Sequence, residues 1–362
     1  MIRPKKNLEG LHRVSNPPEN RFNYLRLDKN ENIVPLPEDV VSDIQRLITA
    51  ELISTYPEET EDLYVKIASW VGLKRENVML SSGSDAAIKS VFEVFIEEGD
   101  EVVLVSPSYA MYYVYCKMFG ARLKEVFYDE DLFLDGDKVR RALSGSTKLL
   151  CIANPNSPTG TVLPHEDLIK TIEYYKDRDI LVLVDEAYYP YYPETIIGLV
   201  ESLDNLIVTR TFSKACGLAS ARLGFAASGP RITGLLQKVR PMYEVNAFAV
   251  KLGHYILDHA DIIDRNLSEM KEGKNYIESA MRDMGFKTFK TYANFLNIEV
   301  GSQQTSRTVH ELLKEEGILV KGGFKDKCLE KCIRITIGTK DQMKYFVEKF
   351  NAVLAKMEVG QR

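Results

Sequence analysis

The sequence of 362 residues contains no long apolar run, and this excludes several classes of protein. A helix that crosses a membrane needs about 18 consecutive apolar residues, whereas the apolar run at 180–184 ends at an aspartate. The N-terminal segment MIRPKKNLEG has basic residues but no apolar stretch behind them, so it does not resemble a secretory signal. We therefore expect a cytoplasmic protein that has no membrane partner.

A surplus of basic charge and a set of paired cysteines are also missing. The 47 Lys and Arg residues are outnumbered by 52 Asp and Glu residues, which gives a net charge of −5. Sequence-independent binding of nucleic acid needs the opposite balance, so a small-molecule partner is expected instead. The five cysteines show no paired spacing, and Cys328 and Cys332 have no second pair or nearby histidine to complete a zinc site. We expect reduced thiols and no bound metal.

Short apolar runs that alternate with helical stretches dominate the first two thirds of the chain. This rhythm is typical of a mostly parallel sheet with helices on both faces. The predicted strands are 78–80, 101–105, 123–127, 148–153, 180–184, 205–209 and 223–227. The predicted helices between them are 85–97, 110–119, 136–143 and 166–178. The fold class is therefore α/β, with about seven strands in one sheet.

The pattern changes after about residue 245. A long helix is expected over 260–284, followed by strands at 295–300 and 332–337 and helices at 305–316 and 341–356. Residues 1–35 contain four prolines and many polar side chains, which favours an arm over a core element. The expected organisation is an N-terminal arm (1–35), a large domain (36–245) and a smaller α+β domain (246–362).

Two polar turns follow predicted strands of the large domain, where functional residues of an open α/β sheet collect. Residues 81–85 (SSGSD) lie between a strand and a helix, so their N–H groups and the helix dipole could bind a phosphate. The alternative is a capped helix start, because Ser and Asp are good N-caps. Residues 154–160 (NPNSPTG) form a rigid turn, and a turn is all that their composition requires.

Two further strand ends carry charged residues. Asp185 and Glu186 directly follow the buried run at 180–184, where carboxylates are desolvated and need a cationic partner. Lys214 follows Ser213, precedes a glycine turn, and lies eight residues before Arg222. Most lysines are solvated surface residues, but this combination at a strand end favours a functional role.

Together these motifs resemble the fold-type I aminotransferases, and most closely the histidinol-phosphate aminotransferase family. That family has Gly-Ser-Asp, Asn-Pro-Asn-x-Pro-Thr-Gly, Asp-Glu-Ala-Tyr, Ser-Lys-x-x-Gly-Leu-x-x-x-Arg-x-Gly and Arg-Ile-Thr-Ile-Gly. All five occur here in that order, at residues 83–85, 154–160, 185–188, 213–224 and 334–338. The resemblance extends from about residue 27 to residue 345.

The resemblance implies pyridoxal 5'-phosphate (PLP) as the cofactor and an aminotransferase reaction. Lys214 would carry PLP as a Schiff base and later move the proton at the substrate carbon. Asp185 would pair with the ring nitrogen, Tyr188 and Asn154 would bond the phenolic oxygen, and Tyr109 would stack on the ring. The residues implied to hold the phosphate are Ser84, Asp85, Ser213 and Arg222.

The resemblance also implies a homodimer with shared active sites that acts on an amino acid or a phosphorylated amine. Tyr56 would reach the cofactor phosphate of the neighbouring subunit. Arg334 would bind the anionic group of the substrate, and Tyr24 and Asn32 of the arm would contribute to the substrate site. Lys321 stands where phosphate-recognising relatives commonly have a second arginine, and lysine lacks the planar fork of arginine.

Two alternatives to an aminotransferase remain at this stage. PLP-dependent decarboxylases of phospho-amino acids (threonine-phosphate or serine-phosphate type) resemble the same family and share every cofactor motif. A binding or regulatory protein with the same fold would have lost the chemistry, but Lys214 and Asp185 are both present. The reaction therefore depends on the substrate end of the site, where the sequence departs from the family pattern.

Overall fold

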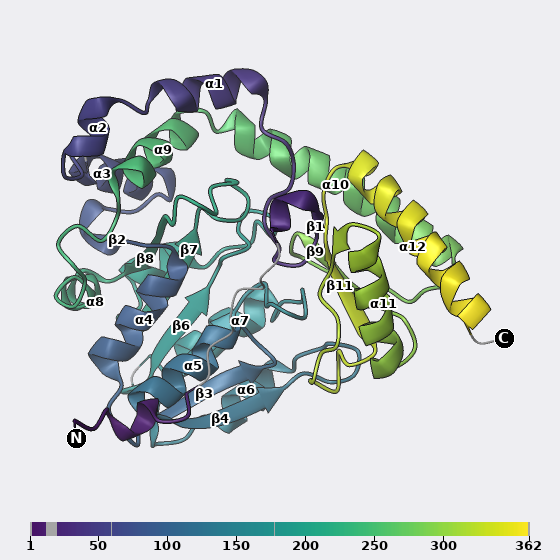
Figure 1. Cartoon of the computed structure of the whole chain (residues 1–362). Helices are drawn as coiled ribbons and strands as arrows, with labels where there is room; N and C mark the ends of the chain where they lie inside the picture. The colour runs from purple at the N-terminus through teal and green to yellow at the C-terminus, as the bar shows by residue number, and fades with distance from the viewer. Residues whose placement is uncertain (1, 12–19, 59, 177, 361–362) are drawn as a thin grey trace.

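A seven-stranded sheet forms the centre of the larger part of the molecule (Figure 1). The computed structural model describes residues 2–11, 20–58, 60–176 and 178–360. The strands follow the order β2-β8-β7-β6-β5-β3-β4. Their bounds are β2 Val78–Ser81, β3 Glu101–Ser106, β4 Arg122–Phe127, β5 Thr147–Ala153, β6 Leu181–Asp185, β7 Leu206–Thr211 and β8 Gly224–Ser228. Only β8 runs against its neighbours in this sheet, which confirms the expected mostly parallel arrangement.

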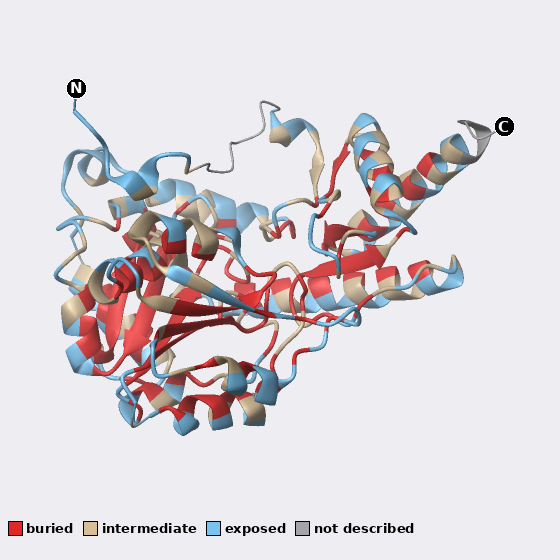
Figure 2. Ribbon diagram, turned by 90° about the horizontal axis from the view of Figure 1, so that it is seen from below, coloured by how far each residue is buried: buried red, intermediate tan, exposed pale blue. Residues whose placement is uncertain are grey.

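Both faces of this sheet are covered by helices, because successive residues of a strand point to opposite sides. Val102 and Leu104 of β3 pack with one helix layer, whereas Val103 and Val105 pack with the other. The first layer consists of α4 (Ser84–Phe95), α5 (Ala110–Phe119) and α8 (Pro230–Leu236). The second contains α3 (Thr60–Trp70), α6 (Gly136–Ala142), α7 (His165–Tyr174) and α9 (Ala247–Asp258). In Figure 2 the strands between these helices are buried throughout much of their length.

The smaller part of the molecule is built on a two-stranded antiparallel sheet with three helices. The strands are β9 (Phe295–Glu299) and β11 (Cys332–Thr336), and they pair in the register Asn297 to Arg334. The helices are α10 (Asp261–Asp283), α11 (Gln303–Glu315) and α12 (Lys340–Gly360). Their apolar faces share one core, and Figure 1 shows α10 and α12 side by side.

The N-terminal arm contributes to this smaller core, which its polar composition did not predict. Strand β1 (Leu25–Arg26) pairs in parallel with β10 (Ile318–Leu319), and Leu27 and Ile33 are buried among the side chains of the small domain. The part of the expected arm at residues 1 and 12–19 lies outside the described residues. The later part of the arm packs in the core of the small domain through Leu27, Ile33 and strand β1.

The expected boundary at residue 245 precedes α9, whose buried side chains belong to the core of the sheet domain. Ala249 and Val250 of α9 and Ile263 of α10 pack in that core, whereas Met270 and Ile277 of α10 pack in the smaller one. We therefore propose that the smaller domain begins within α10. This helix then connects the two domains as one continuous rod.

Several short elements had no expected counterpart in the sequence. They are η1 Lys6–Leu8, η2 Arg21–Asn23, α1 Glu38–Arg46, α2 Ala50–Ser54, η3 Arg75–Asn77 and η4 Ile197–Glu201, besides α3, α8 and α9. Within the described ranges no helix is both long enough and apolar enough to cross a membrane.

Candidate active site

The expected site residues of the large domain lie where parallel strands of the sheet end. Strand β6 ends at Asp185, and the main-chain N–H of Asn154, which follows β5, donates to the carbonyl of Asp185 at 2.9 Å. Strand β7 ends at Thr211, just before Ser213 and Lys214. Because neighbouring parallel strands end at the same edge of a sheet, the motifs that follow β5, β6 and β7 lie at one edge although they are 30 to 60 positions apart in the sequence.

Asp185 is a buried carboxylate held by neighbouring hydroxyl groups. The hydroxyl of Thr209 donates to its Oδ1 at 3.0 Å, and the hydroxyl of Tyr112 lies 3.4 Å from its Oδ2. Burial raises the pKa of Asp185 to about 6, although these hydrogen bonds act in the opposite direction. A cationic partner would offset that cost, so the environment suits a carboxylate that pairs with a protonated ring nitrogen.

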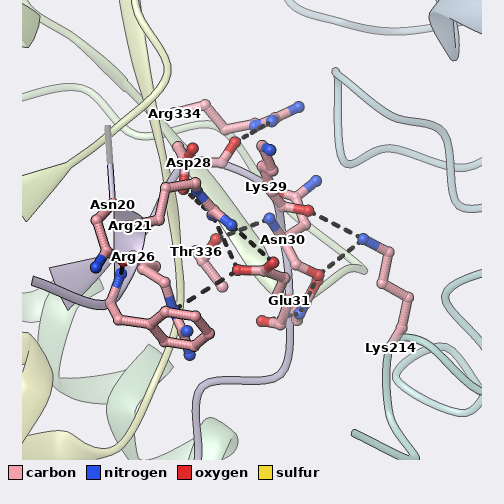
Figure 3. Close-up of polar contacts among 12 residues, drawn as sticks. Asn20, Arg21, Arg26, Asp28, Lys29, Asn30, Glu31, Lys214, Arg334 and Thr336 are labelled. Carbon is pink, nitrogen blue, oxygen red and sulfur yellow. Dashed lines mark hydrogen bonds and ion pairs between the residues drawn. The ribbon is translucent and has the colours of Figure 1, made fainter. Parts of the chain in front are cut away.

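Lys214 extends from the large domain toward the N-terminal arm. Its Nζ donates to the main-chain carbonyls of Lys29 and Asn30 at 3.1 and 2.9 Å (Figure 3). The same nitrogen lies 5.7 Å from the centroid of the Tyr188 ring. Burial lowers the pKa of the Lys214 amine, and the positive charge of Arg334 acts in the same direction. A lowered pKa leaves more of the amine neutral, as a nucleophile or a proton acceptor requires.

An anion cradle forms where α4 begins. Gly83 caps this twelve-residue helix with φ 79°, and a Cβ at Gly83 would lie 2.5 Å from Nη2 of Arg222. Arg222 itself has φ 57°, and its Nη1 donates to the hydroxyl oxygen of Ser213 at 3.2 Å. A guanidinium and a hydroxyl thus face the positive end of a helix, whose first N–H groups belong to Ser84 and Asp85. This arrangement fits the phosphate of the expected cofactor.

The carboxylate of Asp85 is turned toward tyrosines. Its Oδ1 accepts a hydrogen bond from Tyr115 at 2.9 Å and lies 3.5 Å from the hydroxyl of Tyr109. This placement leaves the main-chain N–H of Asp85 as the group that suits a phosphate. Tyr109 packs edge-on against Tyr112, which in turn contacts Asp185, so Tyr109 connects the cradle to the buried carboxylate.

Arg334 of β11 brings a guanidinium from the small domain into the site. Its Nη2 donates to the carbonyl of Asp28 at 3.0 Å, its Nη1 donates to Ser157 at 3.3 Å, and its Cζ lies 5.0 Å from the centroid of the Phe295 ring. Its Nε is buried and has no partner among the described residues. Burial lowers the pKa of Arg334. A desolvated guanidinium with an unpaired donor is suited to bind an anion.

Lys321 lies beside Arg334 on the neighbouring segment. The main-chain N–H and carbonyl of each residue bond to those of the other, at 2.9 and 2.7 Å. Residues that exchange both bonds in an antiparallel bridge project their side chains to the same face. The structure therefore pairs the two cations that the sequence assigned to the substrate.

The remaining expected residues have diverse surroundings. The hydroxyl of Tyr188 accepts a hydrogen bond from Asn30 Nδ2 at 2.9 Å. Oδ1 of Asn154 accepts one from the N–H of Leu163 at 2.8 Å. The side chain of Asn32 is used locally, since its amide donates to the carbonyl of Ala215 at 3.3 Å and its oxygen accepts from Val34.

Two expected site tyrosines lie on the surface of the single chain. The side chain of Tyr56 is 72% exposed and stacks on Tyr243, with 4.4 Å between the ring centroids. Tyr24 borders a surface hollow formed with α11 residues Glu311 and Lys314. The geometry of one chain therefore does not join these tyrosines to Lys214.

Asn30, Tyr112 and Thr209 contact the expected site, yet sequence reasoning did not select them. Asn30 lies in the same Asn-Glu-Asn run as Asn32, and only the fold shows which asparagine faces Lys214 and Tyr188. Thr209 sits one strand away from Asp185 at the same level, a position that follows from the strand register. The strand pattern could have indicated Thr209, but no local pattern indicated Tyr112.

Comparison with known proteins gives one consistent family. The family Aminotransferase class I and II matches residues 23–350. A histidinol-phosphate aminotransferase of Caldanaerobacter subterraneus is 32% identical over 91% of this chain and 93% of its own length. One from Thermoanaerobacter pseudethanolicus is 33% identical over the same shares. The crystal structure of histidinol-phosphate aminotransferase from Sinorhizobium meliloti in complex with pyridoxal-5'-phosphate superimposes with a TM-score of 0.88, at 24% identity and 99% coverage of both chains.

These findings confirm the fold, the family and the cofactor that the motifs implied. The superposition covers 99% of the chain, and the family match includes all five motifs. The chain therefore belongs to the class I and II aminotransferases, and it is a PLP-dependent transaminase.

Proposed function

We propose that this transaminase exchanges the amino group of a small phosphorylated or acidic amine with a 2-oxo acid, and that histidinol phosphate is the amine to test first. The observation that carries the proposal is the pair of cations at the substrate end, Arg334 and Lys321. The buried Nε of Arg334 has no partner in the described part of the chain. The relatives that are named histidinol-phosphate aminotransferases support this choice of substrate.

The assignments at the cofactor end belong to the same proposal. Lys214 would anchor PLP, and the buried carboxylate of Asp185 would pair with the ring nitrogen. Tyr188 and Asn154 would bond the phenolic oxygen, and Tyr109 would cover the ring. Ser84, Asp85, Ser213 and Arg222 would hold the phosphate.

The chain's own groups then perform three tasks. When bound, PLP supplies an electron sink that stabilises negative charge at the substrate carbon. The neutral amine of Lys214 would take the proton from that carbon, as its lowered pKa permits, and the ammonium group so formed would be the acid that gives the proton back. The carboxylate of Asp185 stabilises positive charge on the ring nitrogen. Arg334 orients the substrate through its anionic group, so that the reacting carbon faces Lys214.

The proposed active form is a homodimer in which Tyr56 serves the partner subunit. Tyr56 and Tyr243 form a stacked pair at the surface, and Ile53 and Met242, close to them in sequence, are also exposed. Exposed apolar groups in one place are typical of an interface. A cytoplasmic location, expected from the sequence, is part of the same proposal.

A single-turnover experiment tests the reaction and the substrate class together. The PLP form of the purified protein is mixed with histidinol phosphate, glutamate, phosphothreonine or histidinol, and the absorption of the PLP and pyridoxamine forms is followed. Histidinol is the matched control, since it lacks only the phosphate. We expect histidinol phosphate to give the pyridoxamine form, glutamate to give it without release of carbon dioxide, and histidinol to react far more slowly. Stoichiometric carbon dioxide from phosphothreonine, without the pyridoxamine form, would replace the transaminase assignment by a decarboxylase.

A further inference from the structure

Asn30 is a buried arm residue that contacts both domains. It is 2% exposed, and its φ of 55° lies in the left-handed region, which Asn tolerates better than most residues. Its N–H donates to Thr336 Oγ1 at 3.0 Å, and its carbonyl accepts from Asn294 at 3.2 Å. The same carbonyl accepts from Lys214 at 2.9 Å. Figure 3 shows Asn30 between Thr336 of the small domain and Lys214 of the large one.

The side chain of Asn30 has a separate partner. Its Nδ2 donates to the hydroxyl oxygen of Tyr188 at 2.9 Å, whereas its Oδ1 is buried and has no partner among the described residues. The main-chain contacts hold the arm in place. The side-chain contact, in contrast, acts on one hydroxyl group that faces the cofactor end of the site. The two roles can therefore be separated by substitution.

The direction of this hydrogen bond determines what Tyr188 can do. A phenol oxygen that accepts an N–H keeps its own hydrogen for donation elsewhere. Hydrogen bonds in a chain polarise one another, so the accepted bond strengthens the donated one. The centroid of the Tyr188 ring lies 5.7 Å from Lys214 Nζ. The Tyr188 hydroxyl group therefore lies close to the proposed attachment point of the cofactor.

We infer that Asn30 is a positioning residue, whose side-chain amide fixes the Tyr188 hydroxyl so that it donates its hydrogen to the phenolic oxygen of the bound cofactor. The inference rests on the proposed roles of Lys214 and Tyr188. Donation to that oxygen favours the deprotonated form of the lysine-linked cofactor. Loss of the Asn30 amide therefore shifts the pH at which the linked cofactor changes colour toward higher values.

Two substitutions at residue 30 separate the amide from the backbone. Asn30→Gly keeps the left-handed backbone and both main-chain groups but removes the amide. Asn30→Asp keeps the shape and replaces the N–H donor by an acceptor. Asn20→Gly is the matched control in the same arm, because the Asn20 side chain caps an exposed turn and bonds only Phe22 among the contacts described.

The readout is the absorbance of the lysine-linked cofactor as a function of pH. We expect the midpoint to rise by about half to one pH unit in Asn30→Gly, as the loss of one hydrogen bond implies. It should rise at least as far in Asn30→Asp and remain in place in Asn20→Gly. In a Tyr188→Phe background, Asn30→Gly should cause no further shift, because the hydroxyl through which it acts is gone.

An unchanged midpoint in Asn30→Gly, or a shift that persists in the Tyr188→Phe background, overturns the inference. If Asn30→Gly does not fold, Asn30→Asp decides the question: its carboxylate also acts through its charge, so the shift must be larger with Tyr188 than in the Tyr188→Phe background, and equal shifts overturn the inference. Failure of borohydride to fix the cofactor on Lys214 in the unmodified protein would instead refute the proposed function. The two failures are thus distinguishable.

Discussion

The cofactor end and the substrate end of the site are assembled in different ways. Asp185 and Lys214 are placed by neighbouring strands of one sheet, and their partners lie within the same domain or in the arm. Arg334, in contrast, contacts the carbonyl of Asp28, which is 306 positions away in the chain. The substrate end therefore exists only when the arm, the large domain and the small domain have come together.

This difference explains where the sequence departs from the family pattern. Strand register determines which groups meet at the cofactor end, so a change there would disturb both the sheet and the chemistry. At the substrate end, Lys321 stands where the family resemblance leads us to expect a second arginine. Lys321 lies beside Arg334, to which it is bound through the main chain, and its flexible stem carries a point charge without a planar fork. The comparison predicts that substitutions at the cofactor end abolish the reaction, whereas those at the substrate end change its selectivity.

The largest effect is expected from Lys214→Ala. Removal of the amine eliminates both covalent attachment and proton transfer, so turnover should fall by at least ~10²–10⁴-fold. Borohydride reduction followed by peptide mapping should find the cofactor on Lys214 in the unmodified protein and no adduct in the variant. Lys124→Ala, at an exposed position of β4, is the matched control and should retain the adduct. An adduct on another lysine would contradict the assignment.

The next largest effect separates the two cations at the substrate end. Arg334→Ala should reduce kcat/KM for every anionic substrate by about 2–5 kcal/mol in transition-state binding, because a desolvated anion loses its fixed partner. Lys321→Ala should cost less, since a point charge on a flexible stem attracts without orienting. Steady-state kinetics with histidinol phosphate and glutamate measure both. Equal losses would mean that Lys321 is a full partner in anion recognition.

The strands of the large domain could be predicted because their buried apolar runs are short and punctuated by polar turns. All seven appear within one or two residues of their expected positions, and helix α5 has the expected bounds. Helix α9 was missed although it contains Ala249 and Val250 at its buried face. A mostly apolar helix shows no clear amphipathic period, so its sequence pattern did not indicate that it packs in the core of the sheet domain.

The site could be predicted as far as its motifs are local. The cradle at Gly83 and Arg222 depends on positive φ at two positions far apart in the sequence, yet both lie within recognisable motifs. The roles of Asn30 and Asn32 could not be separated, because both are asparagines beside Glu31 and only the docked arm determines which one faces Lys214. Tertiary contacts, not residue types, decide such positions.

A smaller effect concerns the cost of the buried carboxylate at the cofactor end. Burial raises the pKa of Asp185 from its ordinary value of 3.8 to about 6 in the folded chain. Between these two pH values the folded state keeps a proton on Asp185 that the unfolded state has lost. The free energy of unfolding of the cofactor-free protein should therefore fall as pH rises from about 4 to about 6, by on the order of 2–3 kcal/mol in total, and then level off.

Asp185→Asn provides the comparison for this pH dependence. The variant carries no titrating group at this position, so its stability relative to the unmodified protein should increase over the same pH window. Urea denaturation of both cofactor-free proteins at several pH values measures the difference, in which the contributions of all other groups cancel. If the free energies of unfolding of the two proteins changed in parallel with pH, the pKa of Asp185 would not be raised in the folded state.

The smallest signal is expected from a mixed dimer, which tests whether the cofactor end is completed by a second chain. If Tyr56 serves the partner's cofactor, one site of a dimer between Lys214→Ala and Tyr56→Ala chains carries both substitutions and the other carries neither. Random refolding of equal amounts makes about half of the dimers mixed, so up to about a quarter of all sites regain full activity. The unmixed variants, refolded separately, provide the baseline.

The size of the recovered activity depends on how much Tyr56 contributes, so the Tyr56→Ala homodimer is measured first. Tyr243, which stacks on Tyr56, provides the control. Tyr243→Ala removes the ring against which Tyr56 packs but keeps the hydroxyl group of Tyr56. If the hydroxyl acts across the interface, mixing Lys214→Ala with Tyr243→Ala should restore less activity than mixing it with Tyr56→Ala, because the Tyr243 variant begins with a smaller defect. Absence of recovery, with exchange of subunits confirmed by differently tagged chains, would place Tyr56 outside the partner's site. The cofactor end would then be complete within one chain.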